Sequence, residues 1–138
     1  MNVIIIGASG LLGSTFMSIL GTKGHNVQPL PYKNLVTSSP LKIAGLLSGV
    51  DLVIHSAANT NVEKCEINPD ESYRDNFLLT DLIASACKIK GIQLVYISST
   101  GVYGNYQTSP FKEYSVTLSL IHISEPTRRT PISYAVFC

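Results

Sequence analysis

Short runs of β-branched residues alternate with amphipathic stretches along the first hundred residues. The run Val3–Ile6 ends at Gly7, which is typical of a strand buried on both faces of a sheet. Apolar residues then recur at helical spacing as far as Leu20, and Gly21 and Gly24 predict the end of that helix. A buried strand followed by an amphipathic helix is therefore expected to open the chain.

The same alternation continues to residue 97. Asn68 predicts a helix N-cap, Pro69 the first helical position, and Lys90 the approximate end of that helix. The other expected elements are strands over 26–30, 51–55 and 92–97 and a short helix from about residue 40. This order predicts an α/β fold, namely a Rossmann-type doubly wound parallel sheet of which the chain holds the N-terminal portion.

Composition and charge exclude several classes of protein. Of the 138 residues, 45% are hydrophobic and 14% charged, which predicts one domain with a packed core. The net charge is +1 and no basic run exceeds Arg128-Arg129, so a nucleic-acid partner is not expected. No apolar run approaches the ~18 residues of a membrane span. Cys65, Cys87 and Cys138 are odd in number and lack metal-ligand spacing, which favours a reducing, cytoplasmic setting and no metal site.

The stretch "IIIGASGLLGSTF" carries a glycine motif, Gly7-x-x-Gly10-x-x-Gly13, between the first strand and the first helix. In a dinucleotide-binding turn the first glycine allows a tight bend, the second lets the backbone approach a pyrophosphate, and the third lets the helix pack closely on the strand. A plain glycine-rich connection is the alternative, and the strand and helix on either side favour the dinucleotide site.

Backbone amides and one lysine complete the predicted cofactor site. The amides near Ser9, Leu11 and Leu12 have no helical partner and are expected to point at the phosphates, helped by the helix dipole. An acid that binds the ribose 2′-hydroxyl usually follows about 20 residues on, but no Asp or Glu lies between residues 27 and 35. Lys33 is the only charge there and would suit a 2′-phosphate, so NADP(H) is favoured over NAD(H); a solvated loop lysine is the alternative.

The stretch "VIHSAANTNVEKCEINPDESYRDN" is more specific than the glycine motif. It resembles the dTDP-4-dehydrorhamnose reductase (RmlD-like) branch of the extended short-chain dehydrogenase/reductase superfamily. "YISSTGVYG" and "SPFKEYSV" resemble later segments of that group, so the similarity covers about residues 1 to 116. The matching positions are Ala57, Ala58, Thr60, Val62, Glu63, Glu66, Pro69 and Asn76.

The resemblance implies an NADP(H)-dependent reduction of a nucleotide-linked 4-keto sugar. Ala57 and Ala58 would border the cofactor, and the Ser99 hydroxyl would polarise the sugar carbonyl. The family also places a Tyr-x-x-x-Lys pair downstream, but no tyrosine after Ser99 has a lysine four residues on. An NAD-dependent sugar-nucleotide epimerase or dehydratase and a non-catalytic nucleotide-binding regulatory protein stay open as alternatives, as does a homodimer for the intact parent.

The end of the chain departs from the pattern. "LSLIHISEPTRRTPISYAVFC" has no helical apolar stripe and resembles a translated sequencing-adapter read-through. We therefore expect residues 1–116 to be an incomplete NAD(P)-binding Rossmann domain, residues 117–138 to be a non-native tail, and the chain to be an inactive fragment. A divergent natural tail is the alternative. With a strand order of 3-2-1-4, residues 95–97 would form an open sheet edge.

A few single residues carry further expectations. Asn76, inside the second long helix, is expected to bond across to a strand or to pack as a satisfied polar residue. His55 ends a strand and is expected to be a satisfied histidine, because no partner at metal-ligand spacing is visible. The core residues expected on the second long helix are Phe77, Leu78, Ile83 and Ile89.

Overall fold

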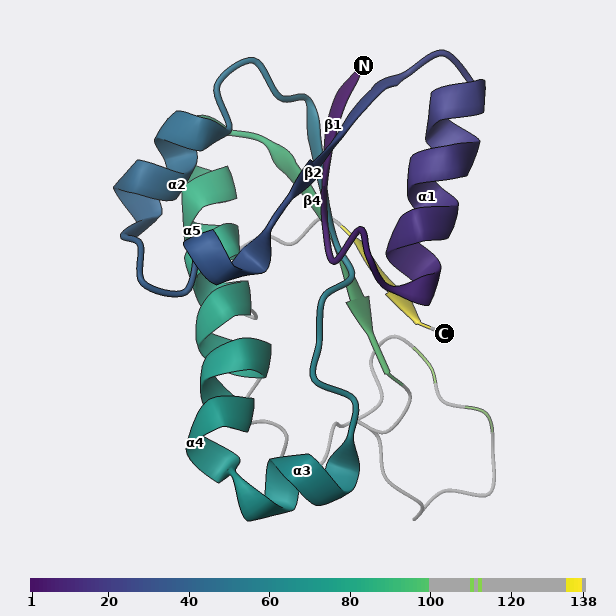
Figure 1. Ribbon diagram of the computed structural model, residues 1–138. Coiled ribbons are helices and arrows are strands. Elements are labelled where there is room, and N and C mark those ends of the chain that lie inside the picture. Colours follow the sequence, from purple (N-terminus) through teal and green to yellow (C-terminus); the bar gives the residue numbers. More distant parts are fainter. Residues whose placement is uncertain (100–109, 111, 113–133, 138) are drawn as a thin grey trace.

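A parallel five-stranded sheet forms the centre of the protein. The structure is a computed structural model that describes residues 1–99, 110, 112 and 134–137 (Figure 1). Helices cover both faces of the sheet, so the predicted doubly wound α/β fold is confirmed. The strands, in the spatial order β2-β1-β3-β4-β5, are β1 (Asn2–Ile6), β2 (Asn26–Leu30), β3 (Leu52–His55), β4 (Gln93–Ser98) and β5 (Tyr134–Phe137).

The predicted strand order 3-2-1-4 is wrong, and so is the predicted open edge. The third strand of the chain pairs with β1, with Val3 opposite Leu52, so β3 separates β1 from β4. Between β2 and β3 the chain forms the 3₁₀ turn η1 (Tyr32–Asn34) and helix α2 (Pro40–Leu46), and it returns to the sheet on the other side of β1 from β2. The edge of β4 is paired because β5 runs parallel to it, with Val95 opposite Tyr134.

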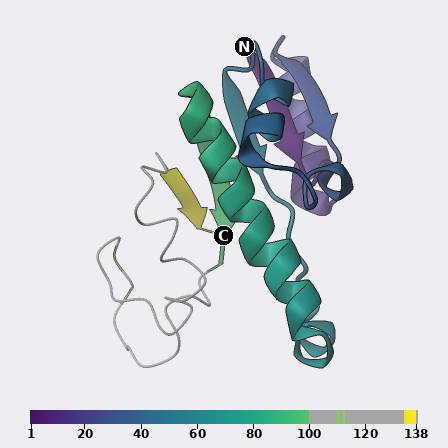
Figure 2. The same cartoon turned by 90° about the vertical axis from the view of Figure 1, so that its left-hand side faces the viewer.

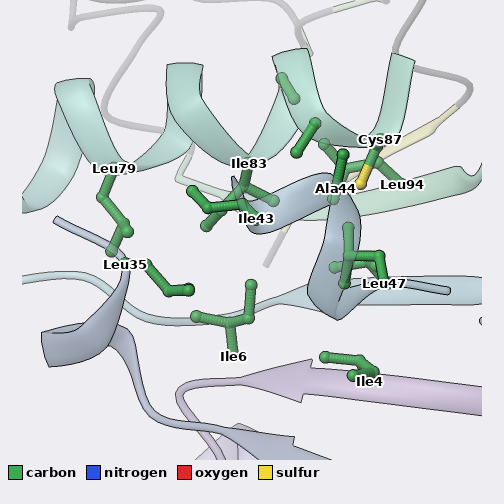
Figure 3. Close-up of a cluster of buried hydrophobic side chains, with 13 residues drawn as sticks. Ile4, Ile6, Leu35, Ile43, Ala44, Leu47, Leu79, Ile83, Cys87 and Leu94 are labelled. Carbon is green, nitrogen blue, oxygen red and sulfur yellow. The ribbon is translucent and has the colours of Figure 1, made fainter. Parts of the chain in front are cut away.

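Helix α1 (Leu11–Thr22) covers one face of the sheet, and α2 and α5 (Leu79–Lys90) cover the other (Figure 1). Alternate residues of β1 face opposite ways, as the pleat requires. Val3 and Ile5 pack toward α1, whereas Ile4 and Ile6 join the larger cluster under α2 and α5. Figure 3 shows side chains of α5 and α2 meeting above β1 in that cluster.

One long rod of helix leads into α5. Helix α3 (Val62–Ile67), which was not predicted, is followed by α4 (Pro69–Ser72), the π-helical turn η2 (Tyr73–Leu78) and α5; the last three follow one another without a break (Figure 2). The predicted end near Lys90 is confirmed. Gly91 has φ 67°, and the amide of Ile92 bonds back to the Cys87 carbonyl at 2.9 Å, so the last carbonyls are capped.

Three details of this rod differ from expectation. Asn68 occupies the N-cap position of α4, but its side chain accepts no capping hydrogen bond, whereas Asn61 caps α3 by accepting from the Lys64 amide at 2.9 Å. Leu78 and Ile89 are exposed, at 39% and 51%, although both were expected in the core. Leu78 is the last residue of η2, and Ile89 lies on the solvent side of α5.

Candidate functional site

A cavity of about 630 Å³ opens at the carboxyl ends of β1 and β3. The turn after β1 forms one wall, which we call the glycine wall and which comprises Gly7 to Gly10. The segment after β3, Ser56 to Asn59, forms the opposite wall, which we call the β3 wall. Residues of α3, α4 and η2 close the far side, and the carboxyl edge of a parallel sheet is where ligands bind in folds of this class.

The two walls touch at Gly7. Its φ is +91°, a conformation that side chains rarely adopt, and a Cβ there would lie 2.6 Å from the Ala57 nitrogen. A Cβ would also lie 2.9 Å from the carbonyl carbon of Ser56. Gly7 is therefore required both by the bend after β1 and by its close approach to the β3 wall.

Gly13 packs closely against the turn, as its spacing predicts, and Gly10 lines the cavity. A Cβ on Gly13 would lie 2.7 Å from the Gly7 carbonyl carbon, so α1 packs directly against the turn. Gly10 lines the cavity at the N-cap of α1 without any side-chain cap, and its own amide bonds to the Gly7 carbonyl at 3.0 Å. The amides of Ser9, Leu11 and Leu12 bond to no acceptor in the described part of the chain. These amides leave the start of α1 able to bind an anion.

A side chain from the π-helical turn holds the β3 wall in place. The Asn76 Oδ1 accepts from the Asn59 amide at 2.7 Å, and the Asn76 Nδ2 donates to the Asn59 carbonyl at 3.0 Å. The Cys65 thiol also reaches the Asn59 carbonyl, at 3.5 Å. Asn76 therefore bonds to the loop after β3 and not to a strand, and it satisfies both backbone groups of one cavity-lining residue.

A buried polar group lies behind this contact. The Thr80 hydroxyl donates to the Asn76 carbonyl at 2.8 Å and lies 3.0 Å from His55 Nε2. His55 has no exposed surface, and burial lowers the pKa of its imidazole to about 4, so the ring is neutral near pH 7. Nδ1 of His55 has no hydrogen-bond partner among the residues that the structure describes, so within them the expectation of a satisfied histidine is only half met. Burial raises the pKa of Tyr96, whose ring lies 5.4 Å from that of His55.

The far side of the cavity carries charge of both signs. Lys64 comes from α3, Glu71 from α4 and Asp75 from η2. Arg74 lies 3.1 Å from the carboxylate of Asp75 and 3.5 Å from that of Glu71. Arg74 neutralises part of the carboxylate charge, so this side of the cavity offers both hydrogen-bond acceptors, at Glu71 and Asp75, and a donor, at Lys64.

The predicted site residues fall into three groups. Ala57 and Ala58 line the cavity, as do three of the predicted residues of the glycine wall, namely Gly7, Ser9 and Gly10. Gly13 packs behind that wall, and Leu11 and Leu12 begin α1 with exposed side chains. Lys33 lies in η1 and Ser99 directly follows β4, and neither is among the cavity-lining residues. The roles of all these residues stay predictions.

Several lining residues were missed from the sequence. Asn59 and Asn61 come soon after the Ala57-Ala58 pair, and their position after a buried strand was the available signal. Tyr32 comes after β2 in the same way. Glu71 and Asp75 reach the cavity only because of the way the helical rod lies, for which the sequence carries no local signal.

The described residues limit what else the site can be. Within them, no group of three or more His, Cys, Asp or Glu side chains is placed to hold a metal ion. None of the helices they form is long and apolar enough to cross a bilayer. Burial raises the pKa of the Cys87 thiol to about 11, which keeps it protonated and unreactive near pH 7.

The fold and the cavity define an α/β domain of the dinucleotide-binding, Rossmann type. A family model described as the RmlD substrate binding domain matches residues 1–120, and the chain belongs to this family. The predicted resemblance is thereby confirmed.

Individual relatives agree with this assignment. A dTDP-4-dehydrorhamnose reductase of Mycolicibacterium smegmatis is 28% identical over 75% of this chain and 32% of its own length. YtcB of Bacillus subtilis, named an uncharacterized UDP-glucose epimerase, is 29% identical over 96% of this chain and 54% of its own. The crystal structure of the dTDP-4-dehydrorhamnose reductase from Yersinia enterocolitica superimposes with a TM-score of 0.80 at 26% identity, covering 99% of this chain and 50% of that one. The chain thus spans about a third to a half of these relatives, and it belongs to a family of enzymes.

Proposed function

We propose that the chain is the cofactor-binding portion of a nicotinamide-dependent enzyme that reduces a nucleotide-linked 4-keto sugar, as a dTDP-4-dehydrorhamnose reductase does. One observation carries the proposal. Among the described residues the amides of Ser9, Leu11 and Leu12 have no acceptor, the start of α1 has no side-chain cap, and the turn adjoins a cavity that Gly7 and Gly10 line. A dinucleotide diphosphate is the anion that such a turn accepts.

The choice of NADP(H) over NAD(H) is a narrower proposal that depends on Lys33. Its neighbour Tyr32 lines the cavity, which brings the η1 turn to the rim of the proposed adenosine side. No acidic residue lies between residues 27 and 35 to bind a ribose 2′-hydroxyl. A lysine at this rim attracts a 2′-phosphate and gains nothing from a free hydroxyl.

The catalytic assignment rests on the family resemblance. When bound, the cofactor supplies a hydride from its nicotinamide ring. The Ser99 hydroxyl, directly after β4, is proposed to donate a hydrogen bond to the sugar carbonyl. The tyrosine and lysine that would supply and tune the proton are absent from this sequence, so we expect the 138-residue chain to bind cofactor weakly and to turn over no substrate.

Calorimetry and an activity assay test the proposal together. The chain is titrated with NADPH and with NADH, and NADPH oxidation is followed with dTDP-4-dehydrorhamnose present. Binding of NADPH without turnover is the expected result. Turnover at an enzyme-like rate would refute the inactive-fragment proposal, and failure to bind either nucleotide would refute the cofactor site.

The proposed extent of the native protein is tested at the level of the gene. Residues 117–138 are proposed to be non-native, with residues 1–116 the incomplete domain. Sequencing the gene from independent source DNA past codon 116 should yield a different continuation that contains Tyr-x-x-x-Lys. Recovery of the same codons for residues 117–138 would contradict the proposal.

A sugar-nucleotide epimerase is the second candidate. The likeness to YtcB of Bacillus subtilis over 96% of this chain favours it. An activity assay of the protein with its restored C-terminal sequence would discriminate the reductase from the epimerase, because an epimerase would return the nucleotide sugar without net consumption of NADPH. A continuation lacking the Tyr-Lys pair would favour a non-catalytic regulatory protein.

For the intact protein we propose a reducing, cytoplasmic setting, because Cys65 and Cys87 are free thiols in this structure.

A further inference from the structure

The β3 wall depends on one side chain for its position. Asn59 lines the cavity from an irregular segment, and both of its backbone polar groups bond to the Asn76 amide, at 2.7 and 3.0 Å. A paired contact of this kind fixes the distance and the orientation of the two groups together. Whatever fixes Asn76 therefore fixes the wall as well.

Asn76 itself lies in the π-helical turn η2, where the helix is wider than an α-helix. Its carbonyl accepts a hydrogen bond from the Thr80 hydroxyl at 2.8 Å. Thr80 is 4% exposed and is not among the cavity-lining residues, so its bond to Asn76 links it to the β3 wall without direct contact with the cavity.

The number of available hydrogens fixes the direction of the hydrogen bonds that Thr80 makes with Asn76 and His55. The Thr80 hydroxyl has a single hydrogen, and a carbonyl such as that of Asn76 can only accept. Because its hydrogen goes to the Asn76 carbonyl, the hydroxyl accepts from His55 Nε2 at 3.0 Å. This assigns the proton of the neutral imidazole to Nε2 and leaves Nδ1 bare, which agrees with the absence of a partner at Nδ1 among the described residues.

We propose that Thr80, oriented by the Nε2–H of His55, is a positioning residue for the cofactor cavity: its hydroxyl holds Asn76, and Asn76 holds the β3 wall against the bound dinucleotide. The contact with the cofactor rests on the proposed function. The positioning of Asn59 by Thr80 does not depend on it, because every contact in the chain of bonds is between protein groups.

Amide hydrogen exchange at Asn59, followed by NMR without any ligand, tests the positioning. Thr80→Val removes the hydroxyl at nearly constant volume, and we expect exchange at Asn59 to accelerate about tenfold, the factor that one hydrogen bond of ordinary net strength supplies. Thr80→Ser restores the hydroxyl and should return exchange to within about twofold of wild type. Thr22→Val is the matched control, because Thr22 makes the same kind of bond, to the Ile19 carbonyl at 2.8 Å, at the far end of α1.

The imidazole tautomer gives a second measurement, made on the unaltered chain. Nitrogen NMR should find the proton of His55 on Nε2. A proton on Nδ1 would overturn the proposal even if Thr80→Val failed to fold, since the Thr80 hydroxyl would then have to donate to His55 in place of Asn76. Unchanged exchange at Asn59 in a folded Thr80→Val would also overturn it.

Titration with NADPH separates this inference from the proposed function. If wild type binds, Thr80→Val should raise the Kd about five- to tenfold, with Thr80→Ser and Thr22→Val close to wild type. An unchanged Kd in Thr80→Val would overturn the link to the cofactor. If wild type does not bind, the proposed function and that link are refuted, whereas the positioning of Asn59 still stands or falls on the exchange rates.

Discussion

The two walls of the cavity are held in place by different means. The glycine wall results from local sequence: three glycines remove side chains where the turn, β3 and α1 crowd together. The β3 wall has ordinary side chains and is positioned by Asn76, which lies 17 residues further along the chain. Gly7 and Gly13 therefore leave no room for an added Cβ, whereas the β3 wall depends on polar partners that a single substitution can remove.

The largest expected effect comes from adding a methyl group where the walls touch. Gly7→Ala places a Cβ 2.6 Å from the Ala57 nitrogen at a φ of +91°. Strain and overpacking together should lower the free energy of unfolding by about 3 kcal/mol or more. Urea denaturation measures the change.

The control for this prediction adds the same methyl group in open space. A Cβ on Gly21, inside α1, would meet nothing within 4 Å. Gly21→Ala should therefore stabilise the chain by about 0.5–1 kcal/mol. Equal effects of Gly7→Ala and Gly21→Ala would mean that the walls do not meet as described.

Acid should lower the stability of the fold through His55, the residue that precedes the β3 wall. The glycine wall has no titratable side chain. The pKa of His55 is lowered from 6.5 to about 4 by burial, so below pH 6.5 the unfolded chain binds a proton that the folded chain does not. The stability is therefore complete above pH 6.5 and falls as the pH drops toward 4, by about 3 kcal/mol in total.

The control for the pH effect keeps a donor without a titrating group. His55→Gln offers a side-chain amide near the position of Nε2, and urea midpoints from pH 7 to 4 should fall less steeply for it than for wild type. Parallel pH profiles for the two proteins would contradict the assignment of the acid sensitivity to His55.

Removing half of the paired contact should have a smaller effect. Asn76→Asp keeps an acceptor for the Asn59 amide but places a carboxylate oxygen near the Asn59 carbonyl. We expect a loss of about 1–2 kcal/mol in stability, the usual result of leaving a partly buried polar group unsatisfied. Asn61→Asp, which keeps its capping acceptor for the Lys64 amide, is the matched control and should be close to neutral. An unchanged free energy of unfolding in Asn76→Asp would argue against the paired hydrogen bonds between Asn76 and the Asn59 backbone.

The smallest expected effect concerns the choice of nucleotide. Lys33→Ala should weaken NADPH binding about threefold and leave NADH binding unchanged, because one exposed charge contributes little in water. Lys42→Ala, on α2 and outside the cavity lining, is the control. An equal effect of Lys33→Ala on both nucleotides would contradict the 2′-phosphate role.

The bend at Gly7 and the close packing at Gly13 could be predicted from the sequence because their determinants are local. Spacing, a preceding strand and a following helix sufficed for Gly7 and Gly13. The sequence placed the residues of the β3 wall after a strand, but it did not show that Asn76 holds this wall in position. Asn76 was expected to bond to a strand or to pack as a satisfied polar residue, and its partner, Asn59, is set by the way the helical rod lies over the sheet.

The remaining errors also have non-local causes. Leu78, expected in the core, is 39% exposed and lies at the end of the π-helical turn η2, which was not predicted from the sequence. The strand order depended on the path of the chain after β2, and the edge of β4 depended on a segment more than 30 residues further on, Tyr134–Phe137. Apolar periodicity cannot report either of these pairings.

The most direct test of the central claim monitors backbone amides of the isotopically labelled chain as NADPH is added. Binding of the diphosphate by the start of α1 predicts saturable shifts at the amides of Ser9, Leu11 and Leu12, together with Asn59 on the opposite wall. Shifts confined to the amino edge of the sheet, around Asn2 and Gly49, or no shifts at all, would contradict the account.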